Sequence, residues 1–203
     1  MIEIYVLSLS SDVERRKRIT AQFKAQDQSF QFVDAPDGRV NEIKRSNTSP
    51  LSNTEAACSL GHLEILNRFI ESNDDWCFVC EDDISISDDF SEQLHITTKY
   101  LEERETPHTV IICGGQQGIN SHFYFVGKSQ GVVGRSKVLR SFYSDNYLFR
   151  TCGYFINRKA AKAIVKLNAG LSIAADNWAH FVKCGAIENL SYLSPGFITH
   201  PTD

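Results

Sequence analysis

Apolar and polar residues alternate along the chain in blocks that predict strands and helices in turn. Short runs rich in β-branched and aromatic residues predict strands over 2–9, 30–33, 76–80, 109–113, 122–127, 147–156 and 189–193. Apolar residues at helical spacing predict helices over about 11–25, 54–72, 90–101 and 158–168, with a further short helix starting near residue 176. This alternation favours an α/β layered domain.

Polar residues at the block edges predict where the helices begin and end. Ser11 and Glu14 fit a capping box for the first helix. Asn53 or Thr54 would cap the helix that follows the polar loop 39–53, and Gly170 is the expected stop signal of the helix over 158–168.

Composition narrows the class of protein. The 203 residues are 42% hydrophobic, which suffices for a core and suits one domain. The 21 basic and 25 acidic residues give a net charge of −4, which argues against nucleic acid as the main partner. The first residues lack the pattern of a signal peptide, and the apolar runs are far shorter than the roughly 20 residues of a membrane span. We therefore expect a soluble cytoplasmic protein.

Six scattered cysteines are expected to be reduced thiols in that compartment. Cys77 and Cys80 form a C-x-x-C motif, but it lies within a predicted strand. Residues three apart on a strand point to opposite faces, which suits neither a zinc knuckle nor a redox pair. Burial as small apolar residues is the simpler expectation.

The most informative feature is the acidic triplet Glu81-Asp82-Asp83, directly after the buried strand 76–80. Residues 74–92 contain eight acidic residues and no lysine or arginine, so nothing nearby in sequence neutralises the triplet. Ligands of open α/β sheets bind at the carboxyl ends of strands, and a hard divalent cation would relieve the repulsion between carboxylates. A solvated acidic turn is the alternative. Phosphoester hydrolysis, nucleotidyl transfer and sugar transfer all remain open from this feature alone.

Several segments in collinear order resemble glycosyltransferase family 25, the bacterial lipooligosaccharide galactosyltransferases and their collagen-modifying relatives. The segments that carry the resemblance are YVLSLS at 5–10 followed by Arg15-Arg16, DAPDG at 34–38, EAACSLGHL at 55–63, FVCEDDI at 78–84, CGYFINRKAAK at 152–162 and ADNW at 175–178. Ala57, Gly61 and Ser8 depart from the family pattern, which bears on the substrate more than on the reaction class.

The resemblance implies a GT-A-like fold, a nucleotide-binding mixed sheet flanked by helices. It places donor-nucleotide binding in about residues 1–115 of a single domain over 1–203, and the acceptor side in about 116–203. It implies inverting transfer of a hexose, galactose first, from a UDP-sugar to a lipooligosaccharide or related surface glycan. Mn²⁺ or Mg²⁺ would hold the diphosphate and act as Lewis acid and template. A sugar-nucleotide-binding module without transferase activity and a metal-dependent phosphoesterase are the alternatives.

The same resemblance assigns roles to individual residues. Asp83 is the first candidate metal ligand, with Glu81 and a C-terminal His200 as further candidates; a plain tail is the alternative for His200. The candidate donor-binding residues are Ser8, Leu9, Ser10, Arg15, Asp37, Gly38, His62 and Asp82. Arg15 could instead be an exposed helical arginine, Asp37-Gly38 a simple turn, and His62 a core histidine.

An inverting reaction needs a general base for the acceptor hydroxyl, and Asp176 matches the family's late aspartate. Its alternative role is that of a helix N-cap. Two groups of basic residues, over 15–18 and 135–140, could touch the inner membrane surface that carries lipid-linked acceptors, although solvated helix faces explain such charges equally well.

Overall fold

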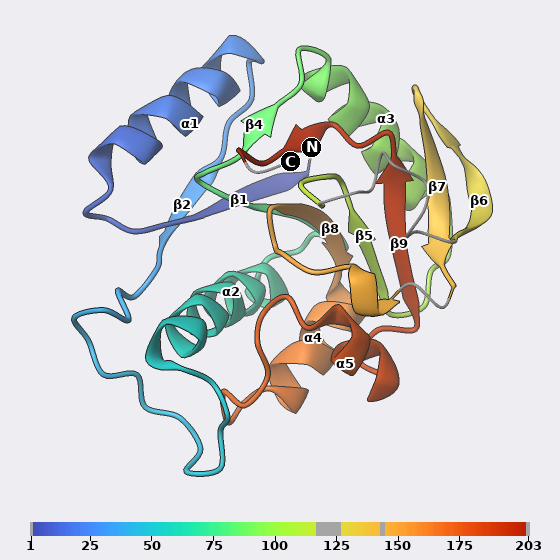
Figure 1. Ribbon diagram of the computed structural model, residues 1–203. Coiled ribbons are helices and arrows are strands. Elements are labelled where there is room, and N and C mark those ends of the chain that lie inside the picture. Colours follow the sequence, from blue (N-terminus) through green and yellow to red (C-terminus); the bar gives the residue numbers. More distant parts are fainter. Residues whose placement is uncertain (1, 117–126, 143–144, 202–203) are drawn as a thin grey trace.

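The protein folds around one large mixed sheet, as the computed structural model in Figure 1 shows. The structure describes residues 2–116, 127–142 and 145–201. Eight strands lie in the order β2-β1-β3-β8-β5-β9-β7-β6. In chain order they are β1 (Glu3–Ser8), β2 (Gln31–Asp34), β3 (Trp76–Glu81), β5 (Thr109–Ile112), β6 (Gly127–Val133), β7 (Ser136–Ser141), β8 (Gly153–Asn157) and β9 (Asn189–Ser194).

Helices cover both faces of this sheet (Figure 1). They are α1 (Val13–Ala25), α2 (Asn53–Glu71), α3 (Phe90–Glu102), α4 (Arg158–Leu167) and α5 (Trp178–Lys183). One core cluster joins the sheet to α2, α4 and α5, and a second joins the opposite face to α1 and α3. Alternate residues of β3 feed the two clusters, so that Cys77 lies in the first and Cys80 in the second. The expectation that these two cysteines point to opposite faces is confirmed.

Strand direction determines which chain ends meet at the site. The strands β2, β1 and β3 are parallel, so their carboxyl ends share one edge of the sheet. The neighbouring β8 is antiparallel to β3, which brings the start of β8 to that same edge. A separate two-stranded sheet of β4 (Ser85–Ile86) and β10 (Ile198–Thr199) returns the end of the chain to the segment that follows β3.

The structure corrects three of the expected helix ends. Asp12, not Ser11, caps α1 and accepts a hydrogen bond from the Arg15 amide. Ser52, not Asn53 or Thr54, caps α2 in a capping box with Glu55. Helix α4 ends at Leu167, and Asn168, not Gly170, is its C-cap. Several cap-forming residues stand side by side at each helix start, and the backbone conformation selects among them; Ser52, for example, is extended.

Two strand expectations also change. The segment expected over 147–156 forms a strand only over Gly153–Asn157, and Asp145–Tyr147 is a short 3-10 helix. Of the segment expected over 122–127, residues 122–126 lie outside the described residues and Gly127 begins β6. The sequence does not predict the hairpin of β6 and β7, because many of its residues are polar and β6 is an edge strand with mostly exposed side chains. In the part of the chain that the structure describes, every helix is too short or too polar to cross a membrane.

Candidate active site

The acidic triplet lies at the sheet edge where the carboxyl ends of β1 and β3 meet. Glu81 is the last residue of β3 and stands in register with Leu7 of β1. The Glu81 amide donates to the carbonyl of Cys152 at 3.3 Å, which ties this point to the start of β8. Three segments that are far apart in sequence therefore surround the triplet.

Asp82 is a buried carboxylate that organises this edge. It is 6% exposed, and its Oδ2 accepts a 2.6 Å hydrogen bond from the Ser8 hydroxyl. Its Oδ1 lies 3.3 Å from the Arg15 guanidinium, and Arg18 donates to its backbone carbonyl at 3.2 Å. The expectation that nothing neutralises the triplet holds only along the sequence, because α1 supplies arginines across space. Both Asp82 oxygens are engaged, which suits a residue that positions its neighbours.

Asp83 is the carboxylate with capacity left for a ligand. Its Oδ2 lies 3.3 Å from the Arg15 Nη1 and 3.6 Å from the His200 Nε2. Its Oδ1 is buried and has no hydrogen-bond partner among the described residues. Burial and repulsion from Glu81 raise the pKa of Asp83, against the attraction of His200 and Arg15. An orphaned buried carboxylate oxygen fits a hard divalent cation.

The short strand pair β4–β10 brings His200 to Asp83. Thr199 pairs with Ser85 in this antiparallel pair, so the next residue along the chain lies back toward the acidic triplet. His200 is thus a placed side chain, and a free tail does not describe it. Of the three expected metal ligands, the structure brings Asp83 and His200 together, whereas the Glu81 Oε1 is directed at Thr151 and His62.

Glu81 connects the acidic edge to helix α2. Its Oε1 accepts a hydrogen bond from the Thr151 hydroxyl and lies 3.4 Å from the His62 Nε2. The His62 ring is 4% exposed, and its Nδ1 lies 3.0 Å from the Tyr154 hydroxyl. Burial opposes protonation of His62, but hydrogen bonds to Cys58 and Glu81 outweigh it and raise the pKa of His62 to about 9. Burial likewise opposes ionisation of Glu81, and the hydrogen bond and charge of His62 outweigh it and lower the Glu81 pKa.

A first hollow, which we call the β1 hollow, opens at the end of β1 and encloses about 750 Å³ of space open to solvent. The turn over 35–39, the start of α2, and Glu81 and Asp82 of the acidic triplet complete its walls. Of the expected donor-binding residues, it is lined by Ser8, Leu9, Arg15, Asp37, Gly38 and Asp82. Ser10 lies in the exposed turn after β1 and His62 lies behind Glu81, so neither contributes to this wall as the described residues form it.

A second hollow, the Asp176 hollow, encloses about 680 Å³ on the other side of Glu81. Asp176 and His200 line it together with residues 150–152 from the start of β8. Cys58 and Glu81 line both hollows. The two spaces therefore adjoin at these two side chains, as the binding sites of two substrates must where a group passes between them.

Asp176 is held by the backbone of the segment before β8. Its Oδ2 accepts a 3.1 Å hydrogen bond from the Arg150 amide, and the Arg150 carbonyl accepts one from the indole of Trp178 at 3.1 Å. Arg150 adopts a left-handed backbone conformation with φ of 66°. Its amide and its carbonyl therefore both face the segment that carries Asp176 and Trp178. Asn177, not Asp176, caps α5. The N-cap alternative for Asp176 is therefore wrong, and the residue lines the Asp176 hollow.

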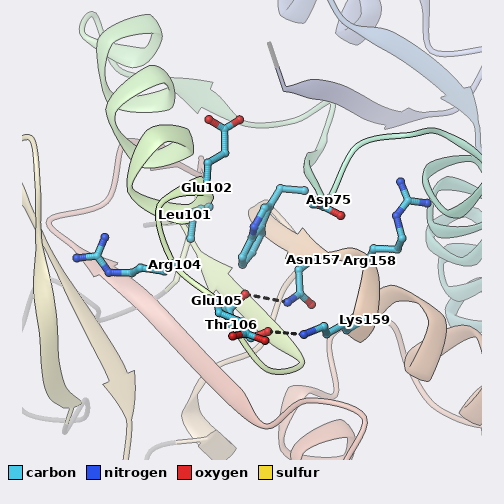
Figure 2. Close-up of a pocket in the computed structure, with 10 residues that line it drawn as sticks. Asp75, Leu101, Glu102, Arg104, Glu105, Thr106, Asn157, Arg158 and Lys159 are labelled. Carbon is cyan, nitrogen blue, oxygen red and sulfur yellow. Dashed lines mark hydrogen bonds between the residues drawn. The ribbon is translucent and has the colours of Figure 1, made fainter.

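A further hollow lies at the opposite end of β3, far along the strand from the acidic triplet (Figure 2). Figure 2 shows Asn157 and Lys159 directed at Thr106, whose hydroxyl and carbonyl they reach at 3.1 and 3.2 Å. Arg158 beside them donates to carbonyls at the end of α2. These contacts hold the neighbouring loops against the sheet. Arg158 and Lys159 thus have structural partners at this end of β3.

Sequence patterns missed several residues of the site. Arg16 donates to both the hydroxyl and the carbonyl of Ser8, at 3.0 and 3.1 Å, and pairs with Asp34. Thr151 orients Glu81, and Cys58 stands where the two hollows meet. The four-residue spacing of Cys58 and His62 in a predicted helix was the available signal, because such a pair shares one helix face.

An open mixed sheet with an acidic strand end and two adjoining hollows is the architecture of α/β proteins that bind their ligands at the carboxyl edge of the sheet. Residues 1–179 match the family described as glycosyltransferase family 25 (LPS biosynthesis protein). The chain belongs to this family, and the expected enzyme class, a glycosyltransferase, is the class of the family.

Individual proteins agree with this assignment. A putative glycosyltransferase of Haemophilus influenzae is 28% identical over 97% of this chain and 71% of its own length. The lacto-N-neotetraose biosynthesis glycosyltransferase LgtE of Neisseria meningitidis is 28% identical over 87% of this chain, which spans 65% of that relative. A solved glycosyltransferase involved in glycosylation of the major capsid of PBCV-1 has a TM-score of 0.50 at 7% identity, covering 99% of this chain and 95% of that one. This likeness concerns the fold, and the expected GT-A-like arrangement is confirmed.

Proposed function

We propose that the chain is a metal-dependent, inverting glycosyltransferase that moves a hexose, galactose first, from a UDP-sugar to a lipooligosaccharide or related surface glycan. The observation that carries the proposal is the meeting of the β1 hollow and the Asp176 hollow at Glu81, two residues before Asp83, whose buried Oδ1 has no partner among the described residues. Membership of family 25 and the biosynthetic roles in the relatives' names support the choice of glycan.

The donor belongs in the β1 hollow. Asp37 and Gly38 offer carboxylate and backbone groups to a nucleoside, and Arg15 offers a cation to a phosphate. The Ser8 hydroxyl holds Asp82 in the wall of the hollow. Asp83, Glu81 and His200 would hold Mn²⁺ or Mg²⁺, which supplies charge stabilisation for the departing diphosphate. Arg16 and Asp82 fix the end of β1, so the donor meets a wall that is already in place.

The acceptor belongs in the Asp176 hollow. Its hydroxyl oxygen attacks C1 of the sugar from the face opposite UDP, the bond from C1 to the phosphate oxygen breaks, and its electron pair leaves on UDP. The Asp176 carboxylate accepts the proton that the hydroxyl loses. One displacement of this kind inverts the anomeric configuration.

The experiment measures UDP released from UDP-galactose and UDP-glucose in the presence of Mn²⁺ and a panel of lactose-type and lipooligosaccharide acceptors. Asp176→Asn retains an oxygen for the Arg150 amide but no base, so we expect turnover to fall by about 10²–10⁴-fold with little change in UDP affinity. Asp75→Asn is the matched control, because Asp75 lies at the opposite end of β3 and turnover should not change.

Two results would redirect the assignment. UDP binding without transfer to any acceptor indicates a binding module. Release of inorganic phosphate or sugar phosphate in place of UDP indicates a phosphoesterase. Peripheral contact with the membrane stays a prediction, since Arg15, Arg18 and Arg135 each have acidic or carbonyl partners within the chain.

A further inference from the structure

Cys58, His62 and Glu81 form a cluster whose chemistry differs from that of the acidic triplet. One ligand atom from each residue lies within 4.8 Å of the other two. Cys58 and His62 are four residues apart on α2 and therefore share a face, and Glu81 reaches them from the end of β3. A thiol, an imidazole and one carboxylate are a mixed sulfur, nitrogen and oxygen set, which suits a borderline transition metal better than a hard cation.

We propose that Cys58, His62 and Glu81 bind Zn²⁺, with the fourth coordination position open to the hollows. Zn²⁺ bonds of about 2.0–2.3 Å in a tetrahedron place ligand atoms roughly 3.3–3.8 Å apart. The His62 Nε2 and Glu81 Oε1 are already 3.4 Å apart. The Cys58 sulfur lies within 4.8 Å of a ligand atom of each of these two residues, and Cys58 is half-buried at the wall of both hollows.

A second set of contacts orients these three ligands. The Tyr154 hydroxyl lies 3.0 Å from the His62 Nδ1, which leaves Nε2 directed at Glu81. The Thr151 hydroxyl donates to the same Glu81 oxygen, Oε1, that faces the His62 Nε2. Metal-binding histidines and carboxylates characteristically have such outer partners, and removing one lowers metal affinity by about 10–100-fold.

This site shares Glu81 with the site proposed for Mn²⁺ or Mg²⁺. A zinc ion there takes the Glu81 carboxylate and stands at the junction of the two hollows. We therefore expect Zn²⁺ to inhibit transfer at concentrations that fill the site. This consequence for activity rests on the proposed function, whereas zinc binding itself is tested without any sugar.

The test uses Co²⁺ as a spectroscopic substitute for Zn²⁺ on the whole chain. Wild-type protein should develop thiolate-to-cobalt charge-transfer absorption that saturates at one Co²⁺ per chain and disappears when Zn²⁺ is added. Cys58→Ser should lose this absorption. Cys184→Ser is the matched control: Cys184 is exposed, its sulfur lies 3.4 Å from the His180 Nε2, and removing it should leave the absorption intact.

A measurement on unaltered protein removes any dependence on the folding of the variants. Zn²⁺ should slow alkylation of Cys58 by iodoacetamide by at least about tenfold and leave Cys184 alkylation unchanged, as read by peptide mass spectrometry. Tyr154→Phe should weaken Zn²⁺ binding by about tenfold. Absence of thiolate absorption in wild type, its survival in Cys58→Ser, or equal protection of both cysteines overturns the proposal.

Discussion

The two neighbouring aspartates of the triplet should respond to the same substitution in opposite ways. Asp82→Asn disrupts a buried carboxylate with both oxygens engaged, by Ser8 and Arg15. We expect a loss of about 2–4 kcal/mol in the free energy of unfolding, because such a change leaves buried partners unsatisfied. Asp83→Asn removes a charge whose Oδ1 has no partner among the described residues.

The magnitude for Asp83→Asn follows from two opposing effects. Relief of an unsatisfied buried charge is worth about 1–3 kcal/mol. Loss of the pair with Arg15, whose side chain is 49% exposed, costs about 0–1 kcal/mol. The free energy of unfolding should therefore stay level or rise by up to about 3 kcal/mol, although activity disappears. For a domain of this size each kcal/mol shifts Tm by about 2–4 °C.

The assay is thermal unfolding of wild type and both variants with and without Mn²⁺. A hundredfold excess of Mn²⁺ over its Kd should stabilise wild type by about 2.7 kcal/mol and leave Asp83→Asn unaffected. If Asp83→Asn lowers Tm as Asp82→Asn does, Asp83 belongs to the folded framework and the argument for a cation ligand is refuted. Equal stabilisation of wild type and Asp83→Asn by Mn²⁺ would refute it as well.

Three further substitutions test the framework around the site. Arg16→Lys removes a two-nitrogen contact with the end of β1 and should cost about 1–2 kcal/mol in urea unfolding and weaken UDP binding in calorimetry. Gly114 has a φ of +137°, and Gly114→Ala places a methyl group 2.0 Å from the Ile198 carbonyl oxygen. The substitution should lower the free energy of unfolding by about 3 kcal/mol or more. A Tm within 2 °C of wild type, which corresponds to about 1 kcal/mol or less, contradicts this. Hydrogen bonds from Arg135 lower the pKa of Asp89 to about 2, below its ordinary 3.8. Asp89→Asn should therefore lower the free energy of unfolding by about 1 kcal/mol above about pH 4, and the difference from wild type should vanish as the pH falls through 2.

Most of the fold could be predicted from local patterns of apolar and polar residues. The strands β1 and β3 and the acidic end of β3 follow from burial and composition over six-residue runs. The strands β4 and β10 have two residues each, too few for any periodicity, yet they place His200 beside Asp83. A contact of this kind depends on pairing between distant segments, which one sequence does not encode locally.

The site shows the same division between local and distant information. The acidic triplet is visible in sequence, but its pairing with Arg15 arises only when α1 packs beside the end of β3. Family resemblance supplied Asp176, and the structure supplied the reason for its position, the Arg150 amide. The cluster of Cys58, His62 and Glu81 depends on both kinds of information. The four-residue spacing of Cys58 and His62 on a helix is visible in the sequence, but the approach of Glu81 to that helix is not.

The most direct test of the central claim is the release of UDP from UDP-galactose in the presence of a lactose-type acceptor, measured with Mn²⁺ and again after chelation. The account predicts UDP release and a glycosylated acceptor with Mn²⁺ only, and neither product from Asp83→Asn. Full turnover after chelation, or in Asp83→Asn with Mn²⁺, would contradict a cation-dependent transferase centred on the end of β3.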